Sequence, residues 1–172
     1  MPLPHVSDII RPYIDSTWFT EDSRERGQRV HGAIASWIIG TWSPRLPEKE
    51  QPYFDSFMLW AEQFLTDEGP CEVESVITDP RHGFCGTLDY LGPYATDETV
   101  IDWKTPITES RAWQLAGSAY FHLANLKRKV KRVGNLQLSP KGRMAKMNWV
   151  DNPEKIFPVF LSGLNMWRFF NI

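Results

Sequence analysis

The stretch Val100-Ile101-Asp102-Trp103-Lys104-Thr105 decides the fold that this sequence predicts. Its β-branched and aromatic residues favour a strand, and side chains two apart on a strand leave the same face of the sheet. Asp102 and Lys104 therefore lie side by side, while Trp103 between them points to the opposite face. Taken alone, an Asp-x-Lys pattern more often marks a surface ion pair than a functional site.

A second acidic residue lies on the preceding predicted strand. The segment 84–91 contains Gly86-Thr87-Leu88-Asp89, and turn residues at 92–98 join it to the next strand. An antiparallel pairing of the two strands would bring the carboxylates of Asp89 and Asp102 level with each other. Because two carboxylates on one sheet face need a counter-charge, we expect a Mg²⁺ or Mn²⁺ ion there, which would suit phosphodiester hydrolysis.

The rest of the chain predicts an α/β domain with a mixed sheet. Apolar residues at helical spacing indicate helices over 21–41, with Thr20 as its cap, and from Pro52 until Gly69. Three antiparallel strands follow, then a helix over 109–129, two further strands and a last helix capped by Asp151 or Asn152. At 172 residues we expect one domain, with a helical part over 1–69 and the catalytic sheet with its flanking helices over 70–172.

Three segments carry a resemblance to a known family. Residues 86–89 and 100–105, with Gln114 on the next helix, resemble the PD-(D/E)xK nuclease superfamily. Upstream, Arg26-Gly27-Gln28-Arg29-Val30-His31 is similar to the Gly-x-x-x-His helix motif of its RecB-like exonuclease branch, which includes phage-type exonucleases and the mitochondrial genome-maintenance exonuclease. The resemblance covers residues 6–170 and implies a restriction-endonuclease-like core, with a mixed central sheet flanked by helices.

The resemblance also implies roles for individual residues. Asp89 and Asp102 would be the metal carboxylates, and Lys104 would be the catalytic lysine. His31 would be a metal ligand from the first helix, and the carbonyl of Trp103 would complete the metal's ligands. From the helix pattern alone, a lone histidine such as His31 is more often a satisfied core residue.

The sequence does not decide the residues or their roles at two further positions of the family pattern. Gln114 would support the lysine or contact the DNA backbone, but the tyrosine that usually follows four residues later is replaced by Ser118. Tyr120 lies off the face of Gln114, so we expect it to be a core or groove aromatic. On the first strand, Glu74 or Glu72 faces the site as the family's early acidic residue, or both lie on a solvated strand face.

The formal net charge of −2 hides a strong asymmetry. Residues 1–109 carry 8 basic and 19 acidic side chains, whereas residues 110–150 carry 9 basic and no acidic ones. We expect the basic segment to guide DNA phosphates, with affinity that falls steeply with salt. The alternatives are ordinary solvation and a fold that brings the two charges together. The candidate phosphate contacts are Lys127, Arg128, Lys129, Lys131, Arg132, Lys141, Arg143 and Lys146.

Composition excludes several classes of protein. Cys71 and Cys85 are too few for the iron–sulfur cluster of some RecB-like relatives, so none is expected. The chain has neither an apolar stretch of membrane-spanning length nor a signal peptide, which predicts a soluble, intracellular protein without a membrane partner. Aromatic side chains that could stack on unpaired bases are Trp18, Trp42, Trp113 and Trp149, although most of the eight tryptophans are expected in the core.

The leading hypothesis is a Mg²⁺- or Mn²⁺-dependent deoxyribonuclease that acts as an exonuclease on DNA ends or single strands. Its role would be in replication, recombination or repair, beside proteins of those processes, and its small size suggests a phage or mobile element. A structure-selective or restriction-type endonuclease is the alternative within the enzyme class. The alternative of another class is a module that binds single-stranded DNA without cutting it.

Overall fold

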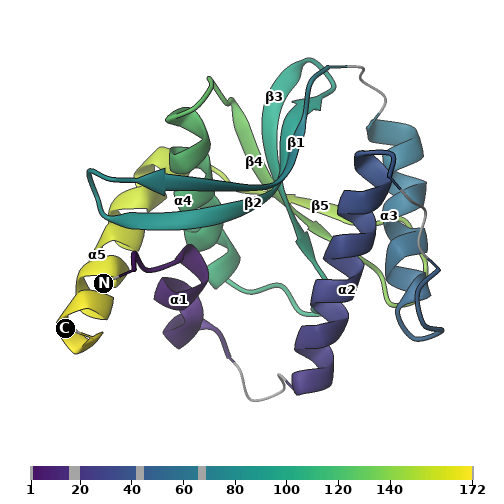
Figure 1. The fold of residues 1–172 in the computed structure, drawn as a ribbon, viewed down its shortest axis with the longest axis horizontal. Coiled ribbons are helices and arrows are strands. Elements are labelled where there is room, and N and C mark those ends of the chain that lie inside the picture. The colour runs from purple at the N-terminus through teal and green to yellow at the C-terminus, as the bar shows by residue number, and fades with distance from the viewer. Residues whose placement is uncertain (1, 16–19, 42–44, 66–68, 172) are drawn as a thin grey trace.

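A five-stranded mixed sheet lies between two groups of helices (Figure 1). The computed structural model describes residues 2–15, 20–41, 45–65 and 69–171. The strands are adjacent in chain order, from β1 at one edge to β5 at the other. They are β1 (Glu72–Asp79), β2 (Phe84–Tyr94), β3 (Asp97–Lys104), β4 (Arg132–Gln137) and β5 (Lys146–Trp149).

The strands pair antiparallel except for β3 and β4, which are parallel. A parallel pair needs a crossover connection, and helix α4 (Ala112–Asn125) provides it. The remaining helices in the described chain are α1 (Val6–Ile10), the 3₁₀ turn η1 (Arg11–Tyr13), α2 (Glu21–Ile38), α3 (Gln51–Phe64) and α5 (Pro153–Asn171). The α/β fold class with a mixed sheet and flanking helices, predicted from the sequence, is therefore confirmed.

Each face of the sheet has its own apolar core. Helices α1, α4 and α5 cover one face, where Leu88 and Val100 of the sheet are buried against Leu123. Helices α2 and α3 cover the other, where Trp103 is 1% exposed and packs edge-on against Phe57. Trp103 thus points away from the face of Asp102 and Lys104, as the period of two predicts.

The boundaries of some elements differ from the sequence prediction. Helix α1 was not predicted, and its start is capped by Asp8, whose carboxylate accepts the His5 amide hydrogen. Helix α4 is shorter than the predicted 109–129. It ends because the Asn125 side chain turns to accept the amide hydrogen of Val130, which closes the chain beyond the helix into a turn.

Helix α2 is fixed at its start and near its middle. Thr20 caps it as predicted, since its hydroxyl oxygen accepts the amide hydrogen of Ser23 at 3.2 Å. Further along, the Arg29 guanidinium forms two short hydrogen bonds to Glu50, which is 5% exposed at the start of α3. This bidentate pair ties α2 to the start of α3.

Candidate active site

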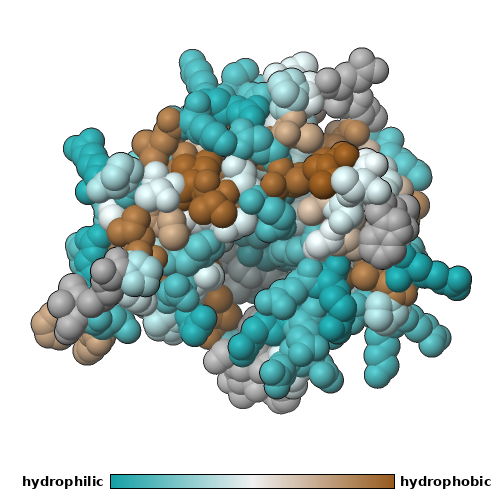
Figure 2. Space-filling view, viewed as in Figure 1, coloured by the Kyte–Doolittle hydropathy of each residue, from teal (hydrophilic) through white to brown (hydrophobic). Residues whose placement is uncertain are grey.

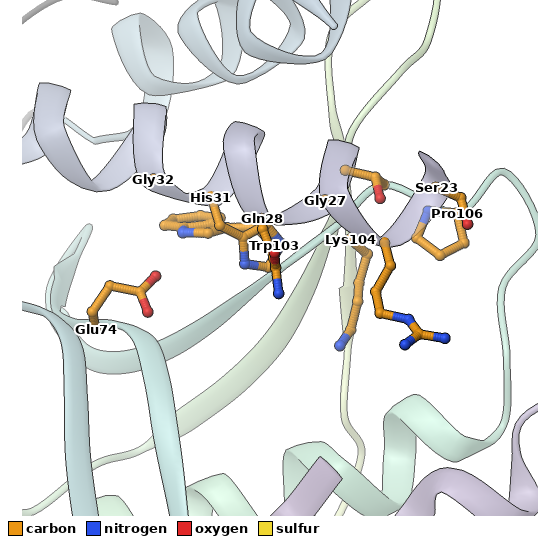
Figure 3. A pocket seen from close by; sticks show the side chains of 11 residues that line it. Ser23, Gly27, Gln28, His31, Gly32, Glu74, Trp103, Lys104 and Pro106 are labelled. Carbon is orange, nitrogen blue, oxygen red and sulfur yellow. The ribbon is translucent and has the colours of Figure 1, made fainter. Parts of the chain in front are cut away.

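A pocket of about 520 Å³ lies between α2 and the strands β1 and β3 (Figure 3). Asp89 and Asp102, which are nearly buried, lie beside it on β2 and β3. Figure 2 shows that the outer surface of α2 is strongly hydrophilic. The pocket is lined by Ser23, Arg24, Gly27, Gln28, His31, Gly32, Glu74, Trp103, Lys104, Thr105 and Pro106.

Asp89 is held by groups from two other elements. The Trp103 amide donates a hydrogen bond of 2.8 Å to its Oδ2 atom, and Nδ1 of His31 lies 3.4 Å from the same oxygen. The ladder between β2 and β3 ends at the pair of Tyr90 with Ile101, one residue before the two aspartates. The strand separation beyond that pair gives the Asp89 carboxylate access to the backbone of β3.

Asp102 and Lys104 form the expected neighbouring pair on β3. Their Oδ2 and Nζ atoms are 2.5 Å apart, so the carboxylate and the ammonium form a close ion pair. Lys104 therefore supplies a positive charge to the nearly buried Asp102 carboxylate. The Lys104 ammonium also lies 5.9 Å from the centre of the Trp113 ring, which gives it a cation–π contact.

The two carboxylates affect each other's protonation. Burial raises the pKa of Asp102, the charge of Asp89 raises it further, and Lys104 only partly opposes them. Burial would also raise the pKa of Asp89, but His31 and the Lys104 ammonium hold it below its ordinary value. The two groups therefore titrate as a pair, with the proton favouring Asp102.

His31 takes part in the same electrostatic system. Burial alone would lower its pKa, but the negative charges of Asp89 and Asp102 raise it above the ordinary value for histidine. Its imidazole is not enclosed by the apolar stripe of α2, because it lies on the pocket wall. Its position is compatible with the metal-ligand role implied by the resemblance, which stays a prediction.

Of the two glutamates on the first strand, it is Glu74 that lies at the pocket. Its carboxylate, Nδ1 or Nε2 of His31 and the Asp89 carboxylate place one ligand atom each within 4.8 Å of one another. Glu74 has a φ of 50°, a left-handed conformation that is costly for a residue with a side chain and is found at functional sites. Glu72 instead contacts Lys127 and Arg128, away from the pocket.

The donor set fits a divalent cation. Carboxylate oxygens of Glu74 and Asp89 and an imidazole nitrogen of His31 lie within 4.8 Å of one another, and the charges of Asp89 and Asp102 affect each other. Carboxylates that share a nearly buried site repel each other unless a cation binds them. Hard oxygen ligands of this kind suit Mg²⁺ or Mn²⁺.

The two residues predicted on α4, Gln114 and Tyr120, are not part of the metal-site group. Gln114 is half-buried, and within the described structure its side chain forms no hydrogen bond with Lys104. Tyr120 is 9% exposed in the core, as expected, and burial raises its pKa, with a further rise from Asp102, Asp89 and Glu74. The Tyr120 ring therefore lies beneath the carboxylates.

The tryptophans that were predicted to stack on bases have different surroundings. Trp113 is 5% exposed, so its ring is not available to a base. The Trp149 ring is covered by the Arg132 guanidinium, 3.6 Å from the ring centre. Trp18 and Trp42 lie outside the described residues.

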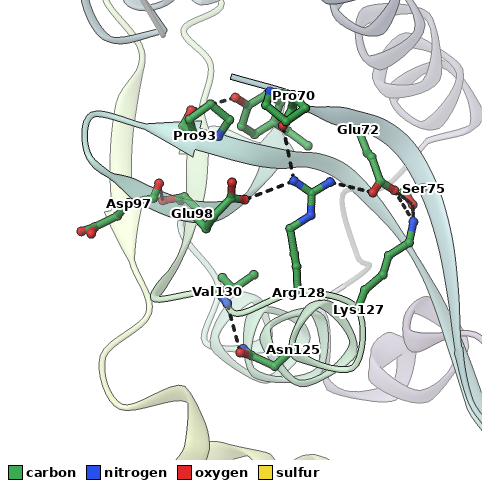
Figure 4. A network of polar contacts seen from close by, with 12 residues as sticks. Pro70, Glu72, Ser75, Pro93, Asp97, Glu98, Asn125, Lys127, Arg128 and Val130 are labelled. Carbon is green, nitrogen blue, oxygen red and sulfur yellow. Dashed lines mark hydrogen bonds and ion pairs between the residues drawn. The ribbon is translucent and has the colours of Figure 1, made fainter. Parts of the chain in front are cut away.

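Three of the basic residues predicted to contact phosphate form ion pairs with acidic strand residues, and Figure 4 shows those of Lys127 and Arg128. Arg128 contacts Glu72 at 2.7 Å and Glu98 at 3.4 Å, and Lys127 also contacts Glu72. Lys131 contacts Asp97 at 2.8 Å. The fold therefore brings these opposite charges together, which was the alternative considered for them, and their contact with DNA stays a prediction. Arg143, Lys129, Lys141 and Lys146 are exposed.

Sequence reasoning did not select two residues that line the pocket. Arg24 and Gln28 lie seven and three residues before His31, so all three share one face of α2. Arg24 is exposed and can reach an anionic ligand in the pocket. The signal was present in the sequence as helical spacing from His31.

No protein-family model matches the chain, and no curated protein matches its sequence. Solved structures do match its fold. A protein from Eubacterium rectale, named provisionally as an exonuclease, aligns with a TM-score of 0.62 at 10% identity, covering 96% of this chain and 79% of that one. A protein named SSO0001 aligns with a TM-score of 0.50 at 12% identity, covering 96% of this chain and 75% of that one.

The chain shares the fold of these structures, with its five-stranded mixed sheet flanked by helices, in agreement with the fold that the resemblance of its motifs implies. In that fold the carboxylates, the histidine and the lysine of the sequence motifs come together at one pocket. No helix in the described part of the chain is long and apolar enough to cross a membrane.

Proposed function

We propose that this protein is a Mg²⁺- or Mn²⁺-dependent deoxyribonuclease that hydrolyses phosphodiester bonds from DNA ends. The observation that carries the proposal is the cluster of His31, Glu74 and Asp89 ligand atoms at the pocket, with the Asp102–Lys104 ion pair on the neighbouring strand. The carboxylates and the imidazole would hold the cation. When bound, it would supply positive charge to the scissile phosphate and help to deprotonate the attacking water.

The residues of the chain would divide the remaining tasks. The Trp103 amide fixes the orientation of Asp89, so the ligand atoms are set before the cation binds. Lys104 would leave its ion pair with Asp102 to orient the attacking water or to stabilise the charge that develops on phosphorus. Arg24 and Gln28, on the pocket face of α2, would position the phosphates next to the scissile bond.

Cleavage of labelled linear DNA tests this function. The wild-type protein should cut with Mg²⁺ or Mn²⁺, stop cutting with EDTA, and be far more active than Lys104→Ala. Equal cleavage by the two proteins would overturn the assignment. Covalently closed circular DNA separates the enzyme classes, because an exonuclease leaves it intact and an endonuclease cuts it.

A non-catalytic module is the second candidate function. The pairing of Lys127, Arg128 and Lys131 with acidic residues leaves a smaller basic surface for DNA under either function. Metal-independent binding of single-stranded DNA without cleavage would support the non-catalytic module. A role beside replication or recombination proteins in the cell is proposed with the nuclease function.

A further inference from the structure

A second group of metal-binding side chains lies away from the pocket. Asp79 ends β1, His82 lies in the turn to β2, and His122 lies on α4 (Figure 1). Their ligand atoms lie within 4.8 Å of one another. Oδ2 of Asp79 is 2.7 Å from Nδ1 of His82 and 2.7 Å from Nε2 of His122.

The Asp79 carboxylate is held in a fixed orientation. Its side chain is 2% exposed, and its Oδ1 atom accepts the backbone amide hydrogens of Arg81 at 2.8 Å and His82 at 3.1 Å. These bonds use one oxygen and direct the other toward the two imidazoles. Outer hydrogen bonds of this kind orient carboxylate ligands in metal sites.

The imidazoles are held by packing and still reach solvent. The His122 ring is stacked on Phe157, with centroids 4.0 Å apart and planes 13° apart, and the His82 ring is edge-on to it. The Arg168 guanidinium of α5 binds the backbone carbonyl oxygens of His82 and Gly83. Because the His82 and His122 side chains are 28% and 25% exposed, an ion in solution has access to them.

We propose that Asp79, His82 and His122 form a second metal site, which takes a divalent transition-metal ion of the Zn²⁺ type. Two imidazole nitrogens and one carboxylate oxygen suit such an ion better than Mg²⁺, and three protein ligands leave one position for water. The site shares no residue with the pocket cluster of His31, Glu74 and Asp89. It is therefore independent of the proposed nuclease activity.

Only small movements are needed to admit the ion. Bonds of about 2.0–2.2 Å in a tetrahedral site place the ligand atoms roughly 3.3 Å apart. The 2.7 Å contacts of Asp79 would have to lengthen by roughly half an ångström, as the ion replaces the hydrogen bonds of His82 and His122. The bound ion would tie the β1–β2 turn to α4, which contributes its ligand 43 residues further along the chain.

Zn²⁺ binding to the full chain tests this site, with the first cluster disabled by Asp89→Asn. Competition with a chromophoric chelator should give one bound Zn²⁺, together with a higher melting temperature. His82→Asn and His122→Gln place an amide nitrogen where each ring nitrogen donates to Asp79, so they retain the hydrogen bond without the ligand. Each should weaken Zn²⁺ binding by about 100-fold or more. His5→Gln, a histidine outside both clusters, is the matched control and should leave Zn²⁺ affinity unchanged.

Unchanged Zn²⁺ affinity in both amide variants, or no binding at micromolar Zn²⁺, would overturn the second site. A measurement on the unaltered cluster covers the case in which a variant does not fold. Zn²⁺, a diamagnetic ion, bound to the Asp89→Asn protein should shift the imidazole NMR signals of His82 and His122 and leave those of His5 in place. Shifts confined to His31 would assign the ion to the pocket and would also overturn the proposal.

Discussion

The backbone amide of Trp103 donates a 2.8 Å hydrogen bond to Oδ2 of Asp89. The same oxygen lies 3.4 Å from Nδ1 of His31, so one carboxylate connects β2 with β3 and with α2. The amide belongs to the main chain of β3, and its position does not depend on a side-chain rotamer. The orientation of Asp89 is therefore a property of the sheet, and the charge of Asp89 can be changed separately from it.

Replacing Asp89 by asparagine should abolish cleavage and leave the fold intact. The side-chain carbonyl oxygen that remains in Asp89→Asn can still accept the Trp103 amide hydrogen, whereas the negative charge that would bind the cation is lost. We expect at least a 100-fold lower rate and weaker Mn²⁺ binding, because even outer-shell changes cost about 10- to 100-fold. Circular dichroism should show an unchanged fold.

The control for this variant is Asp151→Asn, an exposed aspartate outside the pocket. It should cleave DNA at the wild-type rate. Retention of wild-type activity by Asp89→Asn would contradict the metal role of Asp89.

Lys104→Met should separate metal binding from catalysis. The ammonium contacts Asp102 at 2.5 Å, so its removal takes away a positive charge that repels the cation and should leave Mn²⁺ binding at least as tight. Cleavage should fall by about 100-fold or more, since a charge aimed at the developing transition state is lost. Mn²⁺ affinity by electron paramagnetic resonance and cleavage of labelled DNA measure the two effects.

The exposed Lys49, changed to methionine, is the matched control and should affect neither quantity. Loss of Mn²⁺ binding in Lys104→Met, with a normal fold, would show that the lysine organises the ligands and does not act in the chemical step.

The sequence specifies the centre of the site because that part depends on local geometry. The period of two places Asp102 beside Lys104, and a short hairpin brings Asp89 to them. His31 is different, because helical spacing puts it near an apolar stripe and only the resemblance to a nuclease motif selects it. Its position at the pocket depends on how α2 packs on the sheet, which no local pattern encodes.

The remaining details depend on contacts distant in sequence or on the local backbone. Glu74 faces the pocket while Glu72 does not, since Glu74 adopts a φ of 50° that alternation along a strand cannot predict. The basic segment after α4 contains no acidic residue, yet Arg128 pairs with Glu72, 56 residues earlier. The long-range pairing of opposite charges is set by the tertiary fold and is invisible in a count of charges.

The apo protein should lose stability as the pH rises, because of Asp102. Its pKa is raised in the folded state to about 7, from roughly 4 in an unfolded chain, so folding favours the protonated form. Stability from this group is present at acidic pH and is lost as the pH rises through the folded-state pKa. The raised pKa of His31 acts in the same direction.

Melting temperatures in EDTA from about pH 4 to pH 7 measure this effect, because the loss of stability runs from the unfolded-state pKa to the folded-state pKa. Asp102→Asn removes the titrating group, so wild type should melt progressively lower relative to this variant as the pH rises. Mn²⁺ should reverse the difference at pH 8, because it binds the ionised carboxylate. A pH-independent difference would contradict the buried, cation-requiring state of Asp102.

Replacing Arg128 should lower the stability of the protein, whereas replacing Arg143 should weaken its binding to DNA. Arg128→Gln breaks contacts with Glu72 and Glu98, and because these side chains are partly exposed we expect a loss of about 1 kcal/mol or less. Arg143→Gln changes an exposed side chain, so stability should not change. If Arg143 contacts a phosphate, its loss should weaken DNA binding and reduce the salt dependence by about one charge.

Denaturant unfolding and DNA titrations at several salt concentrations distinguish the two residues. A lower unfolding free energy in Arg143→Gln, or an unchanged salt dependence, would remove Arg143 from the phosphate-contacting surface. A smaller salt dependence in Arg128→Gln would mean that Arg128 exchanges its acidic partners for DNA.

Gly27→Ala should stabilise the protein and lower its activity. Gly27 lies inside α2, where alanine is favoured over glycine by up to about 1 kcal/mol. A Cβ atom there would lie 3.6 Å from the Thr105 hydroxyl oxygen, an ordinary contact, so the folded protein gives no reason for glycine. The added methyl group would instead enter the pocket, on the wall that carries His31 one turn later. The melting temperature should therefore rise. If a phosphodiester approaches α2 closely, KM should rise as well.

The matched control is Gly163→Ala, inside α5 and also with ordinary contacts of 3.4 Å or more. It should gain stability with unchanged cleavage. Wild-type cleavage by Gly27→Ala would mean that the substrate does not pass along this face of α2. It would also contradict the proposed role of Arg24 and Gln28 in positioning the phosphates.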